Sequence, residues 1–593
     1  MDEIKNQFLP NAFYPAFRHA VGNQVSLTWC NSSNSITMTF KSIYPIFALM
    51  LLSLLSYSQS WKLAQSLGTP NSNTTVASIR PYNGASAFVS GTFAAPTLPL
   101  GTLTLQNAGQ TDGYVAMVDT NGQYLWAASF GGSDRDAVVH ASAAPDGSFA
   151  VAGNFRSLFM TIGNTNLICS GEVDGFVVKY HSDKTIAWVK KIGTSDLDEV
   201  TGLVVDANGN TYVSGHVSDK LTLSPLFTFV RKYDAAGNQV WEQKGTMEGN
   251  GILSANTLAL GENQDIFLGG WLYGTVKFGS VQLQNDTTYA AFIVRYSPSG
   301  SVLKHYLNGS LDKFNDLKVR GNYLYACAEK VSGGLGWGWP LSDSKIHVLK
   351  MDIEFNTIWH KTAGGENAWL SLDLAKSLSV DNQGNVFVTG SFFSDTLHFA
   401  GQSLPNLFHI NYFYPQIFVC KYSAEGNELW ARSMGGIHAD EGTAIMAFAN
   451  NRFYLGGVYE SNPVQFGTHT LNNTGTLDSM YVHLMPARFV RKTMGFLAVS
   501  NQDTSSLPWE PETLEVLLYP NPVEDHINLQ LQSPVAGPVT VQMYSTDGRL
   551  LRQTTHKTAN TLIREDVPGW PRGVYWVKLT TAKAVFSGKF VKE

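Results

Sequence analysis

A segment spanning residues 196–245 recurs with variations along most of this chain, and this repetition limits the possible folds more than any other feature. The segment is organised as four short strands. The first, at 199–206, leads through a Gly- and Asn-rich turn to the second at 211–217, and two shorter strands follow at 229–233 and 240–241. Repetition of units of this length is typical of propellers and arrays, and four alternating strands per unit favour a β-propeller.

Seven such units can be counted, and their second strands align on a small residue at one fixed position. A glycine at a constant strand position indicates close approach of another backbone, or a bulge. The third strands align as well, ending with residues 481–484 in the seventh unit. The aligned small residues of the second strands are Gly91, Gly153, Gly215, Gly270, Cys327, Gly390 and Gly457.

The fourth strand of the seventh unit is missing, and a matching segment lies at the other end of the chain. Residues 61–68 resemble 430–435 in pattern, although no first three strands precede them. We therefore predict that the N-terminal strand supplies the outer strand of the last blade, because ring closure removes open sheet edges. The alternative is a simple edge strand beside the first unit. Five units carry a tryptophan in this strand, namely Trp126, Trp188, Trp241, Trp359 and Trp430, whereas the fourth unit has Lys304.

Composition argues against several other classes of protein. Charged residues make up 15% of the chain and the net charge is −6, which does not indicate nucleic-acid binding. The four cysteines show no CxxC spacing, and Cys30 precedes the predicted export signal, so we expect no disulfide framework. The folding energy is then expected to come from strand packing.

The N-terminal region carries an export signal. Residues 1–37 form a polar leader, and a basic start at 38–41 precedes a short apolar run at 46–55. This pattern predicts a secretory signal peptide over 38–58, cleaved between Ser58 and Gln59. We predict that Met38 is the true start, in which case residues 1–37 are not translated; the alternative is a long polar leader before the same signal.

The best-preserved turns connect the repeats to a known family. Residues 206–212 and 381–387 match an Asp-x-x-Gly-Asn-x-Tyr-Val-x-Gly core. In this the units resemble the seven-bladed β-propeller repeats of many secreted bacterial proteins, from residue 61 to about 491. The resemblance implies an all-β propeller domain over 59–492. It implies no particular function, since propellers host many unrelated activities.

Aromatic loop insertions in the fifth and sixth units are candidate ligand-binding features. Trp337 and Trp339 lie in one insertion, and Tyr412 and Tyr414 in the other. Flat rings with polar edges suit stacking on a sugar or anchoring of a protein partner. The alternative is that these rings pack over the blade tops.

Acidic pairs recur at the beginnings of several units, and carboxylate oxygens are ligands that Ca²⁺ favours. We regard a calcium site as the weaker interpretation and predict no metal. Asp side chains that bond free backbone N–H groups explain the same pattern. The Asp-x-Asn-Gly-Asn sequence is likewise interpreted as a turn. The calcium candidates are Asp134, Asp136, Asp196 and Asp198, with a further pair at Asp440 and Glu441.

Enzymatic motifs are weak throughout the sequence. It contains no Gly-x-Ser-x-Gly elbow, His-Glu-x-x-His helix or phosphate loop. We therefore predict no catalytic residues and no cofactor. A pair of carboxylates for glycoside hydrolysis would be recognised only from their separation in space.

The C-terminal segment differs from the repeats. Residues 493–516 read as a polar, proline-containing linker, and 517–593 as alternating strands at 527–531, 539–544, 550–552, 574–579 and 585–591. Asp547 and Gly548 form a hairpin turn between two of these strands. About 75 residues in two small sheets make an independent β-sandwich.

This segment resembles, over its full length, the C-terminal sorting domain of the type IX secretion system of Bacteroidota. One departure is residues 567–573, where two extra residues enlarge a loop. The resemblance implies export across the outer membrane, usually followed by removal of the domain and attachment to lipopolysaccharide or release. The alternative is a ligand-binding sandwich. The matching positions are Tyr519, Pro520, Asn521, Pro522, Asp547, Gly548, Gly573, Tyr575 and Lys589.

Together these features predict an exported, all-β protein with a seven-bladed propeller, closed by an N-terminal strand, and a small C-terminal sandwich. We expect a secreted or surface-attached monomer that passes through the periplasm, is recognised by the type IX machinery and binds a glycan or a protein. The alternative is a secreted carbohydrate-active enzyme.

Overall fold

A computed structural model describes most of the chain, and all of its regular elements are β-strands. Searched over its described residues, the structure contains no helix that is both long and apolar enough to span a membrane. The described residues are 14–20, 25–31, 34–40, 61–84, 86–222, 225–332, 343–365, 371–406, 414–448, 452–476, 478–480, 488–490, 492–501, 512–513, 516–531, 539–545, 550–556, 562–580 and 584–593.

The repeats form antiparallel sheets in which consecutive strands are neighbours. The first two sheets contain β5 (Ser78–Pro81), β6 (Ala87–Phe93), β9 (Asp112–Val118) and β10 (Tyr124–Phe130), then β11 (Asp136–Ala143), β12 (Phe149–Phe155), β15 (Asp174–Tyr180) and β16 (Ile186–Ile192). A sheet of seven strands follows, with β17 (Leu197–Val205), β18 (Thr211–Ser218), β19 (Pro225–Tyr233), β20 (Gln239–Leu260), β21 (Ile266–Phe278), β22 (Val281–Tyr296) and β23 (Val302–Asn308).

Three more sheets complete this part of the chain. The next two contain β24 (Lys313–Arg320), β25 (Tyr323–Ser332), β26 (Asp343–Asp352) and β27 (Thr357–Ala363), then β29 (Leu374–Val380), β30 (Val386–Phe392), β33 (Gln416–Tyr422) and β34 (Glu428–Met434). The last has the order β35 (Asp440–Phe448), β36 (Arg452–Tyr459), β41 (Met494–Ser500) and β4 (Trp61–Leu67).

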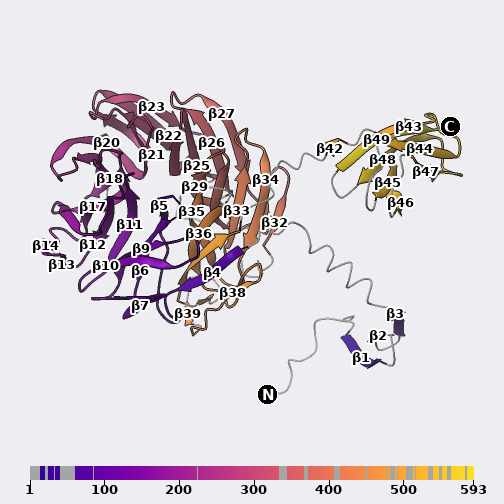
Figure 1. Ribbon diagram of the computed structural model, residues 1–593, viewed down its shortest axis with the longest axis horizontal. Coiled ribbons are helices and arrows are strands. Elements are labelled where there is room, and N and C mark those ends of the chain that lie inside the picture. The colour runs from indigo at the N-terminus through magenta and orange to yellow at the C-terminus, as the bar shows by residue number, and fades with distance from the viewer. Residues whose placement is uncertain are drawn as a thin grey trace, which may run out of the picture. The chain divides into compact units, whose positions relative to one another are not determined.

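The sheets are arranged around a common centre, as in a β-propeller (Figure 1). The innermost strands contact one another in succession, from β5 through β11, β17, β20, β24 and β29 to β35, and β35 contacts β5. The predicted blade number of seven stays a prediction, because β20 runs from the outer edge of one unit into the inner edge of the next and joins the two into one sheet.

The N-terminal strand pairs with the last sheet, as the sequence predicts. In β4, Trp61 lies opposite Ser500 and Leu67 opposite Gly495, so the alternative of an edge strand beside β5 is wrong. The predicted third strand at 481–484 is also wrong, since β41 occupies that position beside β36. The sheet therefore extends past the predicted boundary at residue 492. Residues 481–484 lie outside the described residues.

The fixed glycine position reflects contact between backbones, as the sequence predicts. A Cβ atom on Gly153 would lie 2.0 Å from the backbone oxygen of Ala137 on the neighbouring inner strand. The same clash, at 1.8 to 2.1 Å, occurs at the corresponding glycine of five further units. Beside this glycine the inner strand carries a bulge, since Val138 pairs with Gly153 and His140 with Ala152, which leaves Val139 as an extra residue.

The Asp-x-Asn-Gly-Asn sequences form turns, as interpreted from the sequence. Asp206 Oδ1 accepts hydrogen bonds from the backbone N–H groups of Asn208 and Asn210, both at 2.9 Å. Gly209 adopts a φ of 79°, in the left-handed region that favours glycine. Asp381 makes the equivalent bonds in a later unit.

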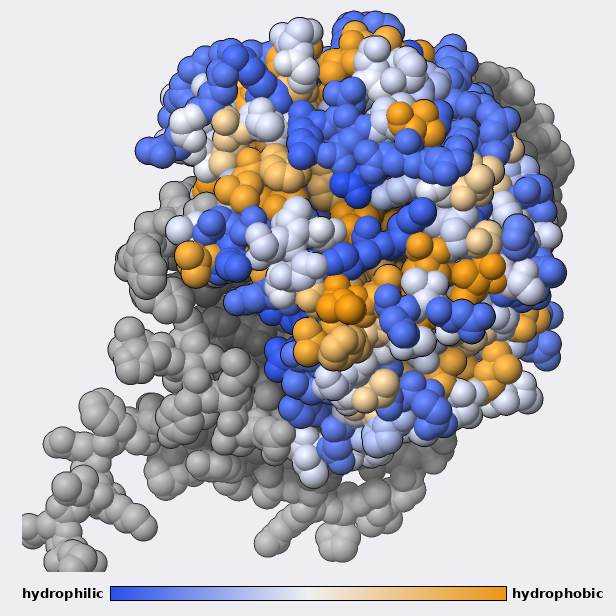
Figure 2. All heavy atoms as spheres, turned by 90° about the vertical axis from the view of Figure 1, so that its left-hand side faces the viewer, coloured by the Kyte–Doolittle hydropathy of each residue, from blue (hydrophilic) through white to orange (hydrophobic). Residues whose placement is uncertain are grey.

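Short hairpins are inserted between the second and third strands of several units. They are β7 (Thr97–Leu100) with β8 (Leu103–Gln106), β13 (Phe159–Ile162) with β14 (Thr165–Ile168), β31 (Thr396–His398) with β32 (Ser403–Pro405), and β37 (Val464–Phe466) with β38 (His469–Leu471). Exposed apolar side chains on and beside the second hairpin include Leu158, Phe159 and Ile168. On that side of the molecule, hydrophobic patches interrupt a mainly hydrophilic surface (Figure 2).

Apolar side chains packed between neighbouring sheets form the core of the propeller, consistent with strand packing as the source of folding energy. Trp61 joins one such cluster with residues of β33, β36 and β41, and its ring makes edge-to-face contacts with Phe453 and Phe466 at centroid distances of 5.5 and 5.3 Å. Cys169, Cys327 and Cys420 are buried free thiols, so the described part of the chain has no disulfide between them.

The C-terminal residues form a compact unit of their own, which begins at Gln502. It is a sandwich of two sheets around an apolar core that includes Ile527, Met543 and Phe590. One sheet has the order β42 (Glu512–Thr513), β49 (Ala584–Lys592), β48 (Gly573–Thr580), β45 (Val539–Ser545) and β46 (Leu550–His556), and the other β43 (Val516–Tyr519), β44 (His526–Leu531) and β47 (Leu562–Asp566). The sequence did not predict β43 and β47.

Near the N-terminus the polar leader forms a three-stranded antiparallel sheet. It contains β1 (Tyr14–Ala20), β2 (Val25–Asn31) and β3 (Asn34–Phe40). The sequence shows no clear period here and did not predict these strands. β3 includes Met38, and the predicted signal continues from there into residues outside the described ones.

Candidate functional site

The bulges of the inner strands build a cavity of about 400 Å³ at the centre of the propeller. The register of six inner strands skips one residue, and each skipped residue lines this cavity. A bulge changes the direction in which a side chain points. For this reason a strand whose other residues pack in the core can place these residues in the central cavity. The residues are Val139, Thr201, Asn256, Asn315, Lys376 and Thr443, and Ala77, directly before β5, takes the corresponding place in the first unit.

The residue after each bulge also lines the cavity in every unit except the third. These are Ser78, His140, Thr257, Asp316, Ser377 and Ala444. In the third unit the residue is Gly202, where a Cβ atom would lie 2.4 Å from Ser214 Oγ. The cavity therefore has one repeated architecture and a varied set of side chains.

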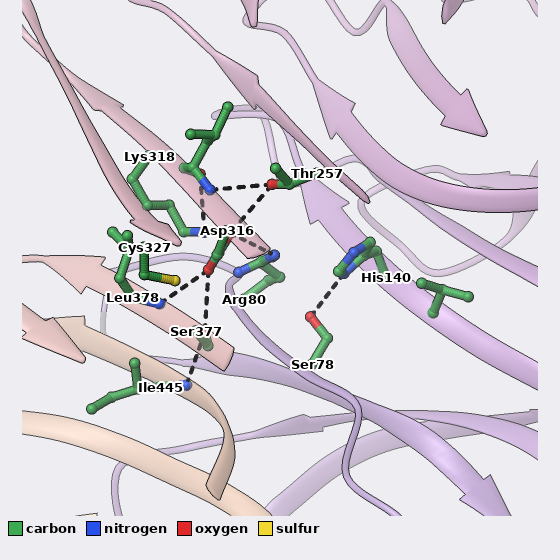
Figure 3. A network of polar contacts seen from close by, with 12 residues as sticks. Ser78, Arg80, His140, Thr257, Asp316, Lys318, Cys327, Ser377, Leu378 and Ile445 are labelled. Carbon is green, nitrogen blue, oxygen red and sulfur yellow. Dashed lines mark hydrogen bonds and ion pairs between the residues drawn. The ribbon is translucent and has the colours of Figure 1, made fainter. Parts of the chain in front are cut away.

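Asp316 is the centre of a buried polar network in this cavity (Figure 3). Its carboxylate lies 2.5 Å from Lys318 Nζ and 3.7 Å from the Arg80 guanidinium, which comes from β5 on another sheet. It also accepts hydrogen bonds from the hydroxyl of Ser377 at 3.2 Å and from the backbone N–H of Leu378 at 3.1 Å. Burial alone would raise the pKa of Asp316, but the two cations outweigh it and the pKa is lowered.

His140 lies beside this network as a neutral side chain (Figure 3). Its Nδ1 is 3.0 Å from the hydroxyl of Ser78. Burial, together with the positive charge of Arg80, lowers the pKa of His140 to about 3. Burial and Arg80 also lower the pKa of Lys318 to about 8, so this lysine is still mainly charged at neutral pH.

The other charged groups at the cavity are paired. Lys376 forms an ion pair with Glu441. Glu199 lies 3.1 Å from His216 Nε2, and the hydrogen bond from His216 lowers the pKa of Glu199. The two carboxyl groups that line the cavity, Asp316 and Glu199, thus both have lowered pKa values.

Amide side chains at the cavity wall bind neighbouring sheets together. Asn154 donates to the backbone oxygen of Val200 and accepts from its N–H, at 3.1 and 2.8 Å. Asn256 donates to Phe314 O, and Asn315 to Ala375 O. Each bond joins one unit to the next, so the contacts between neighbouring units fix the positions of the side chains in the cavity wall.

The predicted aromatic patch lies mostly outside the described residues. Outside the described residues lie Trp337, Trp339 and Tyr412. Tyr414 is described and is 8% exposed, with its ring edge-on to His438 at a centroid distance of 5.3 Å. This side chain packs against the neighbouring unit, and the patch as a whole stays a prediction.

The acidic residues at the beginnings of units bond to loop backbones. Asp136 accepts hydrogen bonds from the N–H groups of Gly132, Arg156 and Ser157 at 2.7 to 3.1 Å. Asp440 accepts the equivalent three bonds in the last unit, and Asp198 accepts the N–H of Thr194. The arrangement supports the loop-capping interpretation over the calcium one.

The partners of these pairs, Asp134 and Asp196, are partly exposed. None of the four calcium candidates lines the central cavity. Among the described residues, no group of three or more His, Cys, Asp or Glu side chains is arranged to hold a metal ion.

The sorting-domain positions cluster where the two ends of the C-terminal unit meet. Asn521 Oδ1 accepts the N–H of Val591 at 2.9 Å, and Val523 N–H donates to Val591 O at 2.7 Å. Tyr575 is buried and its hydroxyl donates to Pro571 O at 2.7 Å. Tyr519, Pro520, Pro522 and Lys589 are exposed, and Gly573 opens β48. Asp547, Gly548, Ser58 and Gln59 lie outside the described residues.

Sequence reasoning missed the cavity residues, although a signal for them exists. Polar pairs such as Asn315-Asp316 and Lys376-Ser377 interrupt otherwise apolar first strands. An alignment of the first strands on the residue opposite the fixed glycine would place the bulge residues at one position and the residues after them at the next.

Two curated proteins match parts of the chain. One is an uncharacterised WD repeat-containing protein of Acanthamoeba polyphaga mimivirus, 24% identical over 184 residues, which cover 26% of this chain and 13% of that protein. The other is the regulatory protein FlaEY of Caulobacter vibrioides, 31% identical over 116 residues, which cover 19% of this chain and 12% of that protein. The chain thus spans about an eighth of the length of either relative.

Solved structures align with the chain over a longer stretch but with low scores. A quinonprotein alcohol dehydrogenase-like protein from Bacteroides thetaiotaomicron is 10% identical, with 69% of this chain and 82% of that chain covered and a TM-score of 0.32. Drosophila Plexin A in complex with Semaphorin 1b is 8% identical, with 75% and 87% covered and a TM-score of 0.33. The assignment of a propeller rests on the strand order of this chain itself.

The family comparison concerns the C-terminal unit. The strands of this unit enclose one apolar core, and the hydrogen bond between Asn521 and Val591 joins its two ends. The family model described as secretion system C-terminal sorting domain matches residues 517–593, so the chain ends in a sorting domain of the type IX secretion system.

Proposed function

We propose that this protein is exported by the type IX secretion system, in a member of the Bacteroidota, and acts outside the cell as a ligand-binding β-propeller. The observation that carries the proposal is the sorting domain at residues 517–593, joined to a propeller with a built central cavity. Rigid scaffolds with varied side chains at one site are a common basis of binding. We include in the proposal an N-terminal signal peptide that passes the chain into the periplasm.

The electrostatics of the cavity favour binding over glycoside hydrolysis. A hydrolase of this kind needs two carboxyl groups in different protonation states, one of them with a raised pKa so that it can donate a proton. Both Asp316 and Glu199 have lowered pKa values, because each is paired with basic side chains. Neither is suited to act as the acid, so the carbohydrate-active enzyme is the second candidate.

Export is tested in a bacterium that has the type IX system. The full chain is expected outside the cell, and a chain lacking residues 517–593 inside it. A matched control attaches 502–593 to an unrelated periplasmic protein, which should then also reach the outside. N-terminal sequencing of the exported protein is expected to begin at Gln59. Export of the truncated chain at the full-length level would contradict the proposal.

Binding is tested separately, with the full chain on an array of glycans and surface proteins. We expect retention of a ligand without change in its mass. Release of shortened saccharides, detected by mass spectrometry, would favour the enzyme instead. A propeller that is exported but retains nothing on either array would point to a purely structural role.

A further inference from the structure

We infer that the central cavity binds a small hydroxylated carboxylic acid, such as a uronic acid, with the ligand's carboxylate on the guanidinium of Arg80. The inference deepens the proposed function by naming a site and a ligand class. It rests on the bulge residues, on the charge balance around Asp316 and on polar groups that the protein leaves unused.

The charge balance at Asp316 leaves one positive charge in excess. Arg80 and Lys318 both pair with this single carboxylate. Lys318 is the closer partner at 2.5 Å, whereas the nearest Arg80 nitrogen is 3.7 Å away, beyond hydrogen-bond distance. Within the described chain, the Arg80 guanidinium makes this one ion pair and no hydrogen bond. A planar guanidinium with unused donors is matched by a carboxylate, which it can bind through two parallel hydrogen bonds.

The carboxylates of the wall argue against a cationic ligand. Asp316 already has two basic partners and three further donors, from Ser377, Leu378 and Thr257. Glu199 is bonded to His216. Around Asp316, the charged group whose donors are left without a hydrogen-bond partner is therefore Arg80.

The rest of the wall suits a ligand with hydroxyl groups. The hydroxyl of Thr201 has no hydrogen-bond partner among the described residues, and Asn315 uses its Nδ2 for two bonds while its Oδ1 accepts none there. His140 and Ser78 bond to each other near Arg80 and add polar edges. A cavity of about 400 Å³ lies in the range of small-molecule sites, roughly 300–1,000 Å³.

The inference is tested by calorimetric titration of the full chain with D-glucuronate, with glucose as the neutral counterpart and acetate as the acid without hydroxyls. We expect glucuronate to bind at least about tenfold more tightly than either. Glucose lacks the charged hydrogen bonds to Arg80, and acetate lacks the hydroxyl groups that would bond to the rest of the wall. Arg80→Met is expected to weaken glucuronate binding about ten- to hundredfold and to leave glucose unchanged.

Two further variants keep the test decisive. Arg135→Met removes an exposed arginine on a loop and should not alter binding. Ala77→Phe fills the cavity from its wall and should abolish binding with Arg80 intact, so a folding defect in Arg80→Met alone does not decide the outcome. Equal affinity for glucuronate and glucose, no binding of glucuronate, or unchanged binding in Ala77→Phe would overturn the inference. None of these results would affect export, which the sorting-domain test measures independently.

Discussion

The pairing of β4 with β41 makes Trp61 a residue on which the whole propeller depends, and Trp61→Ala tests this directly. Trp61 is 8% exposed and packs edge-on against Phe453 and Phe466. Its backbone oxygen also lies 3.1 Å from His469 Nε2. Removal of the ring leaves a cavity at the point where the first strand joins the last sheet.

The expected loss follows from this burial. Replacing a buried Trp with Ala costs about 3–5 kcal/mol, and this range includes the lost ring contacts. With an unfolding entropy of about 2.1 cal/mol/K per residue, the propeller has roughly 0.9 kcal/mol/K. A loss of ~4 kcal/mol therefore lowers the Tm by about 4 °C if the ring unfolds as one unit.

Trp188→Ala is the matched control, because Trp188 occupies the same position in the second unit but is only partly buried. It contacts Tyr233 and donates to Ala235 O at 3.0 Å, so we expect a smaller loss of about 1–2 kcal/mol. Calorimetry measures both variants, and limited proteolysis reports release of β4. Equal destabilisation by the two substitutions, without cleavage near Gly68 in Trp61→Ala, would refute the role assigned to this strand.

Three further outcomes follow from the structure. Asp440→Ala leaves the N–H groups of Gly436, Glu460 and Ser461 without their acceptor, so the free energy of unfolding measured in urea should fall by about 2–4 kcal/mol. Addition of calcium or of EDTA should leave the Tm of the wild type unchanged. The pKa of His140 is about 3 in the folded state and about 6.5 in the unfolded state, so between these values the folded state binds fewer protons and the protein loses stability as the pH falls. His140→Asn should reduce the loss of unfolding free energy between pH 7 and 5 by about 1–2 kcal/mol. If the unfolding free energies of variant and wild type fell in parallel with pH, this prediction would be contradicted. Tyr575→Ala removes a ring stacked on Phe590 and should reduce surface export, measured by immunoblot of intact cells, without a change in the Tm of the separate propeller unit.

The sequence was informative wherever one position is constrained in the same way in every unit. Gly153 and its equivalents are fixed by a neighbouring carbonyl oxygen, so they mark the second strands without exception apart from Cys327. The tryptophans of the outer strands also recur at one position, and this recurrence predicted that the strand of Trp61 pairs with the last sheet. Lys304 replaces tryptophan in β23, yet this strand still pairs with β22 as predicted.

Where neighbouring units differ, sequence reasoning failed. In the last unit the pattern at 481–484 imitates a third strand, but the insertion that precedes β41 moves the true strand to Met494–Ser500. The cavity was missed because its side chains share a backbone position and no chemistry, from Ala77 to Lys376. Bulges decide which residue faces the centre, and an extra residue in a strand shifts the alternation on which strand patterns rest.

The joint between Trp61 and Ser500 also bears on the order in which the protein matures. The first strand of the propeller has no partner until the last strand, immediately before Gln502, is available. A growing or translocating chain must therefore keep its ring open until nearly all of it has passed. The ring can close only once Ser500 is available, so its closure comes shortly before the sorting domain at residues 517–593 follows along the chain.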